Sequence, residues 1–369
     1  MGIPDLRSPT AARATLFLLG ISGCYPLGGE PPGTRQETLP TLTTAAAVHG
    51  LTPSEARRRY PVRLRAVCVV CFPDWHGFFV HDGVSGVYVE TKDQVLLGER
   101  IHPGTELEIE GVSGPGDFAP VIDRAILRVI GEAAVPPPRR VSLDRLSTGV
   151  EDGQWIEVEG TVRSADTSNT MLTLTVASGQ LQMAVMTPKC NGTGYRRLID
   201  ARVRVRGTTG PLFNRRRQLV GVDMYTPSLD QFQVLEPAPA DPFALPAKAV
   251  RDIFAYNPNG GPDHRIRVRG AVTARWRDKE VFITDGIQGA GVLDVQASAL
   301  QPGDIVDVVG FPAVGDYTPT IHEAVFRKLG SGPLPAPRPV TATGALSGDF
   351  DGDLVRIDGR LAAQKRSTD

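Results

Sequence analysis

Two segments of this chain, residues 102–131 and residues 301–330, align with each other without a gap. The identical positions are mostly glycine, proline and isolated apolar residues, with one aspartate and one arginine: Pro103, Gly104, Gly111, Gly116, Asp117, Pro120, Ile122, Ala125, Arg128 and Gly131 recur as Pro302, Gly303, Gly310, Gly315, Asp316, Pro319, Ile321, Ala324, Arg327 and Gly330. Internal similarity of this kind indicates a repeated structural module.

The repeated unit is a whole small domain. Residues 78–89 resemble residues 281–292, so the similarity extends upstream of the first match. A more divergent copy lies between them, over residues 155–221, and a further copy begins at Leu354. A chain of 369 residues has room for about three complete copies, together with the start of a fourth.

Composition favours strands over helices. Aromatic residues make up 6% of the chain, whereas it contains 40 glycines and 31 prolines, which suits short strands joined by tight turns. The formal net charge is -1, from 40 basic and 41 acidic residues, so no overall field attracts a polyanion. Composition alone therefore makes nucleic acid an unexpected partner.

Each module has the strand pattern of a small barrel. Valine, isoleucine or leucine alternates with arginine or glutamate at residues 62–67, 155–162, 266–273 and 354–361, which predicts strands with one buried face. A short helix-like segment precedes each of these strands, and a hairpin, a connection and two further strands follow. Five strands in this order predict an all-β chain of tandem OB-fold-like barrels. Immunoglobulin-like sandwiches are the competing interpretation, but they need about seven strands.

Proline-rich links mark the module boundaries. Prolines cluster at residues 136–138, 237–246 and 333–339, and such links are semi-rigid spacers. The predicted organisation is a signal peptide (1–23), a linker (24–38), module 1 (39–135), module 2 (136–236), module 3 (237–332) and the start of a truncated module 4 (333–369).

The N-terminus has the pattern of an export signal. Arg7 and Arg13 precede a short apolar run, and small residues lead into Cys24. A basic segment, a short apolar core and small residues form a secretory signal. Small residues before cysteine also resemble the lipobox of bacterial lipoproteins, which implies cleavage before Cys24, lipidation of its thiol, and a membrane-anchored protein on the periplasmic side of the cell envelope. A buried first helix is the alternative interpretation.

Cys68 and Cys71 have the spacing of a redox or metal pair, but they lie in an apolar, β-branched segment. Residues three apart in a regular strand point to opposite faces, so the pair is not expected to share a metal. Without a second such pair, we expect two buried structural cysteines and no metal site.

Loops that flank the ligand face of an OB-fold contain the candidate binding residues. Those between the last two strands of each module hold an aromatic residue, which either stacks on a sugar or base or closes the barrel end. The loop after the first strand holds a tryptophan in modules 1 and 3. The full set of candidate ligand-binding residues is Trp75, Phe118, Phe213, Asn214, Arg215, Trp276 and Tyr317.

The combination of the segment 42–67, the hairpin 78–89 and residues 103–122 resembles the extracytoplasmic region of bacterial sensor histidine kinases of the acidobacterial type. In that family, OB-like modules precede a membrane span and a kinase core, and no phosphoacceptor or ATP-binding segment is recognisable here. The resemblance therefore implies the sensory input part of a signalling protein, as a fragment or as a separate lipoprotein.

We accordingly expect a non-enzymatic extracytoplasmic region that binds a small molecule, glycan or protein, with no catalytic residues and no cofactor. Two alternatives stay open. The first is an OB-fold nucleic-acid-binding protein, which depends on the fold and on the arginine runs 57–59 and 215–217. The second is a set of accessory modules of an exported hydrolase.

Overall fold

A computed structural model describes residues 38–72, 74–91, 100–179, 181–190, 192–216, 218–254, 263–276, 280–293 and 300–364. Within these ranges most residues belong to strands, and the helices are single turns. In this part of the chain no helix is long and apolar enough to cross a membrane. The predicted signal peptide and Cys24 lie outside the described residues.

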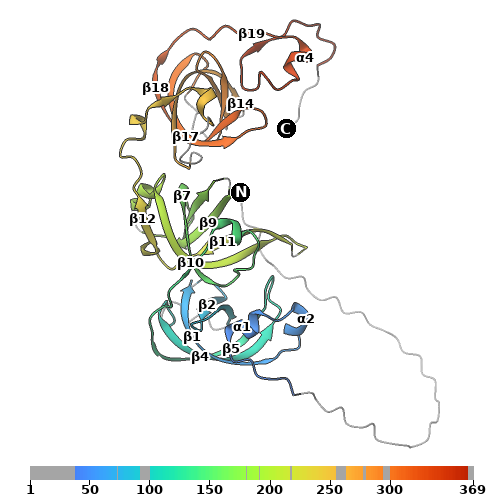
Figure 1. The fold of residues 1–369 in the computed structure, drawn as a ribbon, viewed down its shortest axis with the longest axis vertical. Helices are drawn as coiled ribbons and strands as arrows, with labels where there is room; N and C mark the ends of the chain where they lie inside the picture. The colour runs from blue at the N-terminus through green and yellow to red at the C-terminus, as the bar shows by residue number, and fades with distance from the viewer. Residues whose placement is uncertain are drawn as a thin grey trace, which may run out of the picture. The chain divides into compact units, whose positions relative to one another are not determined.

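The first barrel, which is drawn in blue and teal in Figure 1, is closed. Two short helices, α1 (Ala45–His49) and α2 (Pro53–Ala56), precede it. Its strands are β1 (Pro61–Cys71), β2 (Gly77–His81), β3 (Gly86–Glu90), β4 (Thr105–Gly114) and β5 (Val121–Glu132). The strand order is β1-β2-β3-β5-β4, with β3 parallel to β5 and β4 closing onto β1. This is the topology of an OB-fold.

The second barrel repeats this order. It consists of β7 (Trp155–Thr167), β8 (Met171–Ser178), β9 (Leu181–Pro188), β10 (Arg202–Phe213) and β11 (Leu219–Tyr225), and β10 pairs with β7 to close it. Additional elements are β6 (Arg139–Arg140), α3 (Leu143–Leu146), η2 (Gly194–Leu198), η3 (Leu229–Gln231) and β12 (Phe232–Glu236). Strands β9 and β11 are parallel, as β3 and β5 are in the first barrel.

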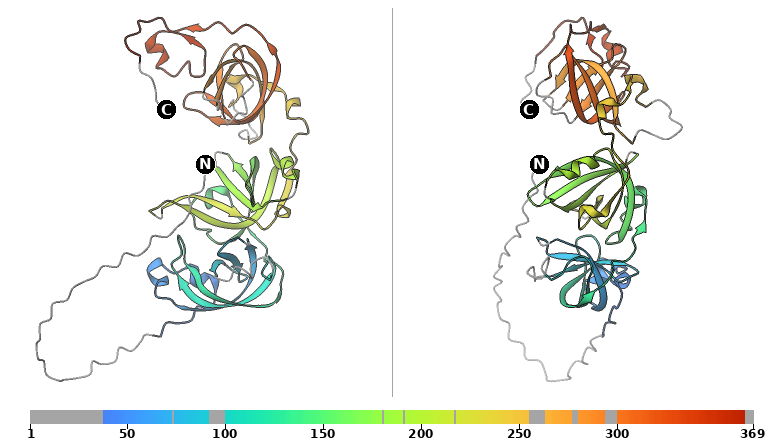
Figure 2. Two further views of the ribbon diagram at one scale, coloured as in Figure 1. Left: turned by 180° about the vertical axis from the view of Figure 1, so that it is seen from behind. Right: turned by 90° about the vertical axis from the view of Figure 1, so that its left-hand side faces the viewer.

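The third barrel also has the same order, and the left-hand view in Figure 2 looks into it. Its strands are β14 (Ile266–Trp276), β15 (Glu280–Thr284), β16 (Gly289–Leu293), β17 (Asp304–Val314) and β18 (Pro319–Ser331). Before it lie η4 (Pro242–Ala244), β13 (Ala247–Lys248) and η5 (Val250–Asp252); after it lie β19 (Arg338–Pro339), α4 (Ala342–Ala345) and β20 (Val355–Arg356). The predicted tandem OB-like architecture, with short helices before the first strands, is thus confirmed.

Strand alternation builds a separate core in each barrel. In β1, Val62, Leu64 and Ala66 are buried, whereas the arginines between them are exposed. The same pattern gives each of the other barrels its own cluster of buried valine, isoleucine and leucine. Each barrel therefore has an apolar core of its own, to which the short helical segments beside its strands contribute.

A β-bulge in β1 corrects the prediction for the cysteines. The pairing of β1 with β2 shifts register between Cys68 and Val70. The extra residue turns both Cys68 and Cys71 into the first barrel's core, and places Val69 and Val70 in a second apolar cluster. The expectation that the two cysteines point to opposite faces was therefore wrong. A hydrogen bond with Cys71, together with burial, raises the pKa of the Cys68 thiol well above its ordinary value.

Adjacent modules make a repeated close contact. A methyl group added to Gly86, in the first barrel's hairpin, would lie 2.0 Å from the carbonyl oxygen of Gly153 in the turn that precedes β7. Gly289 and Gly352 have the same relation, also with 2.0 Å, at the turn that precedes β20. In both places only glycine lets the two backbones approach this closely.

Candidate binding loops and cleft

The loops between the last two strands of the barrels do not close the barrel ends with their aromatic rings. Phe213 is 40% exposed and Tyr317 is 69% exposed, and Phe118 is only half-buried. The ring of Phe118 faces Gly149, and the ring of Tyr317 faces Gly348, each in a turn of the following module. These rings therefore lie at the surface or against the next turn, where a ligand can reach part of them.

The loop after β10 holds two arginines outward. The Asn214 Oδ1 accepts hydrogen bonds from the backbone amides of Arg216 (2.9 Å) and Gln218 (3.2 Å). The Asn214 Nδ2 donates to Gln218 Oε1 at 2.9 Å. This is local turn chemistry of asparagine, and it uses the amide that we had considered for ligand binding. Among the described residues, the side chains of Arg215 and Arg216 have no ion-pair partner, and both are exposed.

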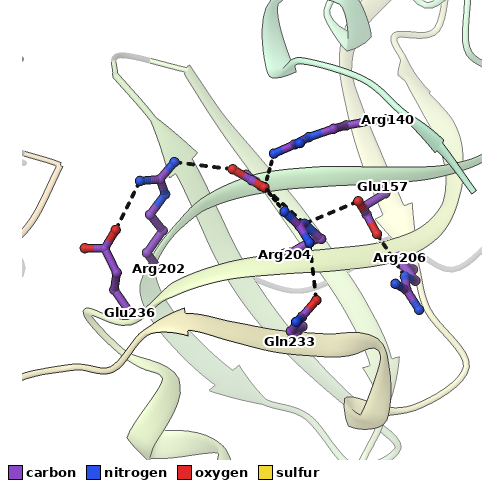
Figure 3. Close-up of polar contacts among 8 residues, drawn as sticks. Arg140, Glu157, Arg202, Arg204, Arg206, Gln233 and Glu236 are labelled. Carbon is purple, nitrogen blue, oxygen red and sulfur yellow. Dashed lines mark hydrogen bonds and ion pairs between the residues drawn. The ribbon is translucent and has the colours of Figure 1, made fainter.

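Most arginines of the strands are, in contrast, neutralised by carboxylates. In Figure 3, Arg204 lies between carboxylates of β7: its Nη2 is 2.6 Å from Glu159 Oε1, and its Nε is 3.3 Å from Glu157 Oε1. Glu159 also pairs with Arg140 and Arg202. Hydrogen bonds from Arg204 hold the pKa of Glu159 below its usual value. The solvent-facing side of these strands, on which the alternating arginines lie, therefore carries a network of ion pairs within the barrel.

A large hollow of about 640 Å³ borders this network, but its basic residues are already paired. Arg140 and Arg202 contact Glu159, and Arg202 also donates to Glu236 at 3.1 Å. Two more acidic residues, Asp144 and Asp263, line the same hollow. A phosphate here would have to displace carboxylates from their arginines, so this surface is a poor polyanion site.

Three of the predicted binding residues meet in one cleft. Trp75, Phe118 and Phe213 line a cavity of about 300 Å³ between the first two barrels. Three further rings, which the sequence did not indicate, line it as well: Phe79, Tyr88 and Tyr225. The cleft therefore contains aromatic side chains from two loops of the first barrel, from its strands β2 and β3, and from β10 and β11 of the second.

The rings of the cleft pack on one another. Tyr225 stacks on Phe79 with 6.1 Å between centroids, and it meets Trp75 edge to face at 4.8 Å. Phe79 in turn meets Tyr88 edge to face at 4.9 Å. Burial raises the pKa of the Tyr225 hydroxyl to about 12, with smaller contributions from nearby aspartates. The second barrel thus covers part of the first barrel's surface around β2 with its own tyrosine.

Carboxylates give the cleft an acidic wall. Glu90, Asp117 and Asp152 line it, and Asp152 Oδ2 lies 3.5 Å from His49 Nε2. Burial raises the pKa of Glu90, and the nearby Asp123 and Asp117 raise it further. The cleft therefore combines an aromatic surface with negative charge.

The other four predicted residues do not line this cavity: Asn214 and Arg215 lie in the loop after β10, and Trp276 and Tyr317 belong to the third barrel. Trp276, at the end of β14, is 60% exposed, and Tyr317 belongs to the loop after β17. Within the described ranges, no group of three or more His, Cys, Asp or Glu side chains is placed to hold a metal ion.

Comparisons with known proteins give structural neighbours alone. No family model matches the chain, and no curated protein matches it. A murine DNA-binding protein bound to double-stranded DNA matches 48% of this chain and 99% of its own length, with 8% identity and a TM-score of 0.26. The HINa domain of Ifi202 in complex with 20-bp DNA matches 48% and 96%, with 13% identity and a TM-score of 0.21. A putative aspartyl-tRNA synthetase from Leishmania major Friedlin matches 31% and 24%, with 9% identity and a TM-score of 0.23.

The DNA-bound domains among these neighbours contradict two of our expectations. One was that nucleic acid is not a partner; the other was that the chain is an extracytoplasmic sensory region for a small molecule, glycan or protein. The first expectation depended on the net charge of the whole chain, which is near zero and hides local arrangement. Arginines paired with carboxylates cancel in the total, whereas Arg215 and Arg216 have no such partner among the described residues.

Proposed function

We propose that this protein binds single-stranded nucleic acid through the loop after β10 of its second barrel. The observation that carries the proposal is the juxtaposition, in residues 213–216, of a 40% exposed aromatic ring with two exposed arginines that no described carboxylate neutralises. The loop is one of the two with which OB-folds hold oligonucleotides.

Each residue of the loop has a distinct task in this proposal. Phe213 offers a face on which an unpaired base stacks, an interaction that tolerates any base because every base has a π-face. Arg215 and Arg216 contact the phosphates on either side of that base. Asn214 ties the loop to Gln218 and so sets the direction in which the arginines project.

The contact is local, so affinity should depend on few charges. The whole chain has a net charge of -1, and the neighbouring cleft is acidic, so no long-range attraction adds to the loop. We therefore expect moderate affinity and a preference for single strands over duplex, because stacking on Phe213 needs a base that is not already stacked on both sides.

The experiment is fluorescence anisotropy of a labelled 20-nucleotide single strand, with wild type and the double variant Arg215→Ala, Arg216→Ala. The matched control is Arg196→Ala, Arg197→Ala, which removes two adjacent exposed arginines of the same barrel from η2. The loop variant should bind at least about tenfold more weakly, while the control stays close to wild type. Equal weakening in both variants, or no binding by the wild type, would refute the proposal.

Phe213→Ala tests the stacking part separately. Loss of a stacked base costs about 1–3 kcal/mol, or roughly a factor of five to a hundred and fifty in affinity. The same variant should retain its far-UV circular dichroism spectrum, since the ring is 40% exposed. Unchanged affinity would limit the interaction to phosphate contacts.

A further inference from the structure

The cleft between the first two barrels has a composition unlike that of the arginine loop beside it. Glu90 and Asp117 come from the first barrel, and Asp152 comes from the turn before β7. Neither lysine nor arginine is among the described residues that line the cavity. Among these lining residues the one basic side chain is His49, which lies beside Asp152. The cleft therefore has an excess of negative charge.

The aromatic rings add to this preference. The face of an aromatic ring carries a negative quadrupole that attracts cations, and six rings line the cleft. Mutual packing holds Trp75, Phe79 and Tyr225 in place before any ligand binds. A site that is already organised loses little entropy when it is filled.

We propose that this cleft binds an organic cation with an alkylated ammonium group. Its volume of about 300 Å³ is at the lower end of the range for small-molecule sites, and is enough for a compact head group. The methyl groups of such an ion contact the rings, and its charge is balanced by the carboxylates. The two barrels contribute different rings to the site, so the ligand contacts both.

Other classes of ligand fit less well. A phosphate or carboxylate ligand would face three acidic side chains without a lysine or arginine. A hard metal ion such as Ca²⁺ takes six or more oxygen ligands, whereas most of the lining here is hydrocarbon and ring. A neutral apolar molecule would offer the Glu90 carboxylate neither a positive charge nor a hydrogen-bond donor.

The test compares choline with 3,3-dimethyl-1-butanol, an uncharged molecule of nearly the same shape, by isothermal titration of the full chain. Choline should bind, and the neutral analogue should bind at least about tenfold more weakly. Glu90→Gln, which removes a charge at constant size, should weaken choline binding by a similar factor. The matched control is Glu110→Gln, an exposed charge on β4 of the same barrel, which should have no effect.

Three results would overturn the inference: equal binding of choline and its neutral analogue, choline binding that is unchanged by Glu90→Gln, or no binding of choline at all. The outcome is separate from that of the proposed function, because the variant Arg215→Ala, Arg216→Ala leaves the cleft intact and should bind choline as the wild type does.

Discussion

Gly86 allows two modules to come into close contact because it has no side chain. An alanine methyl group at this position would lie 2.0 Å from the carbonyl oxygen of Gly153, which is backbone and cannot rotate away. We expect Gly86→Ala to destabilise the docking of the hairpin on the turn by about 1–3 kcal/mol. Urea unfolding followed by tryptophan fluorescence measures the change. Gly131→Ala is the control, because a methyl group there meets nothing within 4 Å; an equal loss in both variants would contradict the contact.

Asp223 is a buried carboxyl group in β11, and it makes no hydrogen bond or ion pair with any described side chain. Burial raises its pKa to about 6 in the folded state. Because this value is above the unfolded one of about 3.9, the group is neutral in both states below pH 4 and does not oppose folding there. As the pH rises through 6 its charged form destabilises the folded state. Asp223→Asn should therefore stabilise the protein at pH 7.5, by on the order of 2 kcal/mol, and have little effect at pH 4. Thermal unfolding at the two pH values tests this, and equal shifts at both would contradict it.

Among individual residues, the sequence indicated three of the six aromatic rings that line the cleft. Trp75 and Phe118 lie in loops, and Phe213 lies at the end of β10 where its loop begins; the place of these loops in a barrel could be inferred from strand order. Phe79 and Tyr225 lie inside strands, where the pattern predicts that an aromatic side chain belongs to the barrel core. They come together only because the two barrels are in contact. A contact between two modules does not change the alternation of apolar and polar residues in either of them, so the sequence pattern cannot reveal it.

At the scale of elements, the bulge in β1 decides the environment of the cysteines. Cys68 and Cys71 are buried and the pKa of Cys68 is raised, whereas Cys190 is only partly buried. Because the thiolate is the reactive form, we expect Cys190 to react with iodoacetamide in the folded protein and the other two to react only after unfolding. Peptide mass spectrometry of the labelled protein identifies each position. Fast labelling of Cys68 would contradict the buried assignment.

The order of the strands was predictable because alternation, turn residues and the internal repeat all indicate the same barrel. The bulge was not, because the apolar run around Cys68 has no alternation by which a change of register could be recognised. The regular hairpin turns were predictable too. Asp82 and Asp285 accept hydrogen bonds from the amides that follow them, and they also accept one from the helical segment before the barrel.

At the scale of the whole molecule, charge is arranged so that most of it cancels. Arginines on the strands face carboxylates across the sheet, as Arg269 faces Asp307 at 2.8 Å. The total of -1 therefore contains little information about any single surface. The loop after β10 differs from these strands, because no described carboxylate neutralises Arg215 and Arg216. The proposed function depends on the positive charge that this leaves at the loop.

The salt dependence of binding to a single strand tests most directly whether the loop after β10 contacts nucleic acid. Each phosphate that an arginine neutralises contributes about 0.7 to the slope of log K against log salt concentration. If both loop arginines contact phosphate, Arg215→Ala, Arg216→Ala lowers this slope by about 1.4, whereas Arg196→Ala, Arg197→Ala leaves it unchanged. A slope that is the same in wild type and in the loop variant would show that these arginines do not contact phosphate, and that the loop after β10 is not the nucleic-acid site.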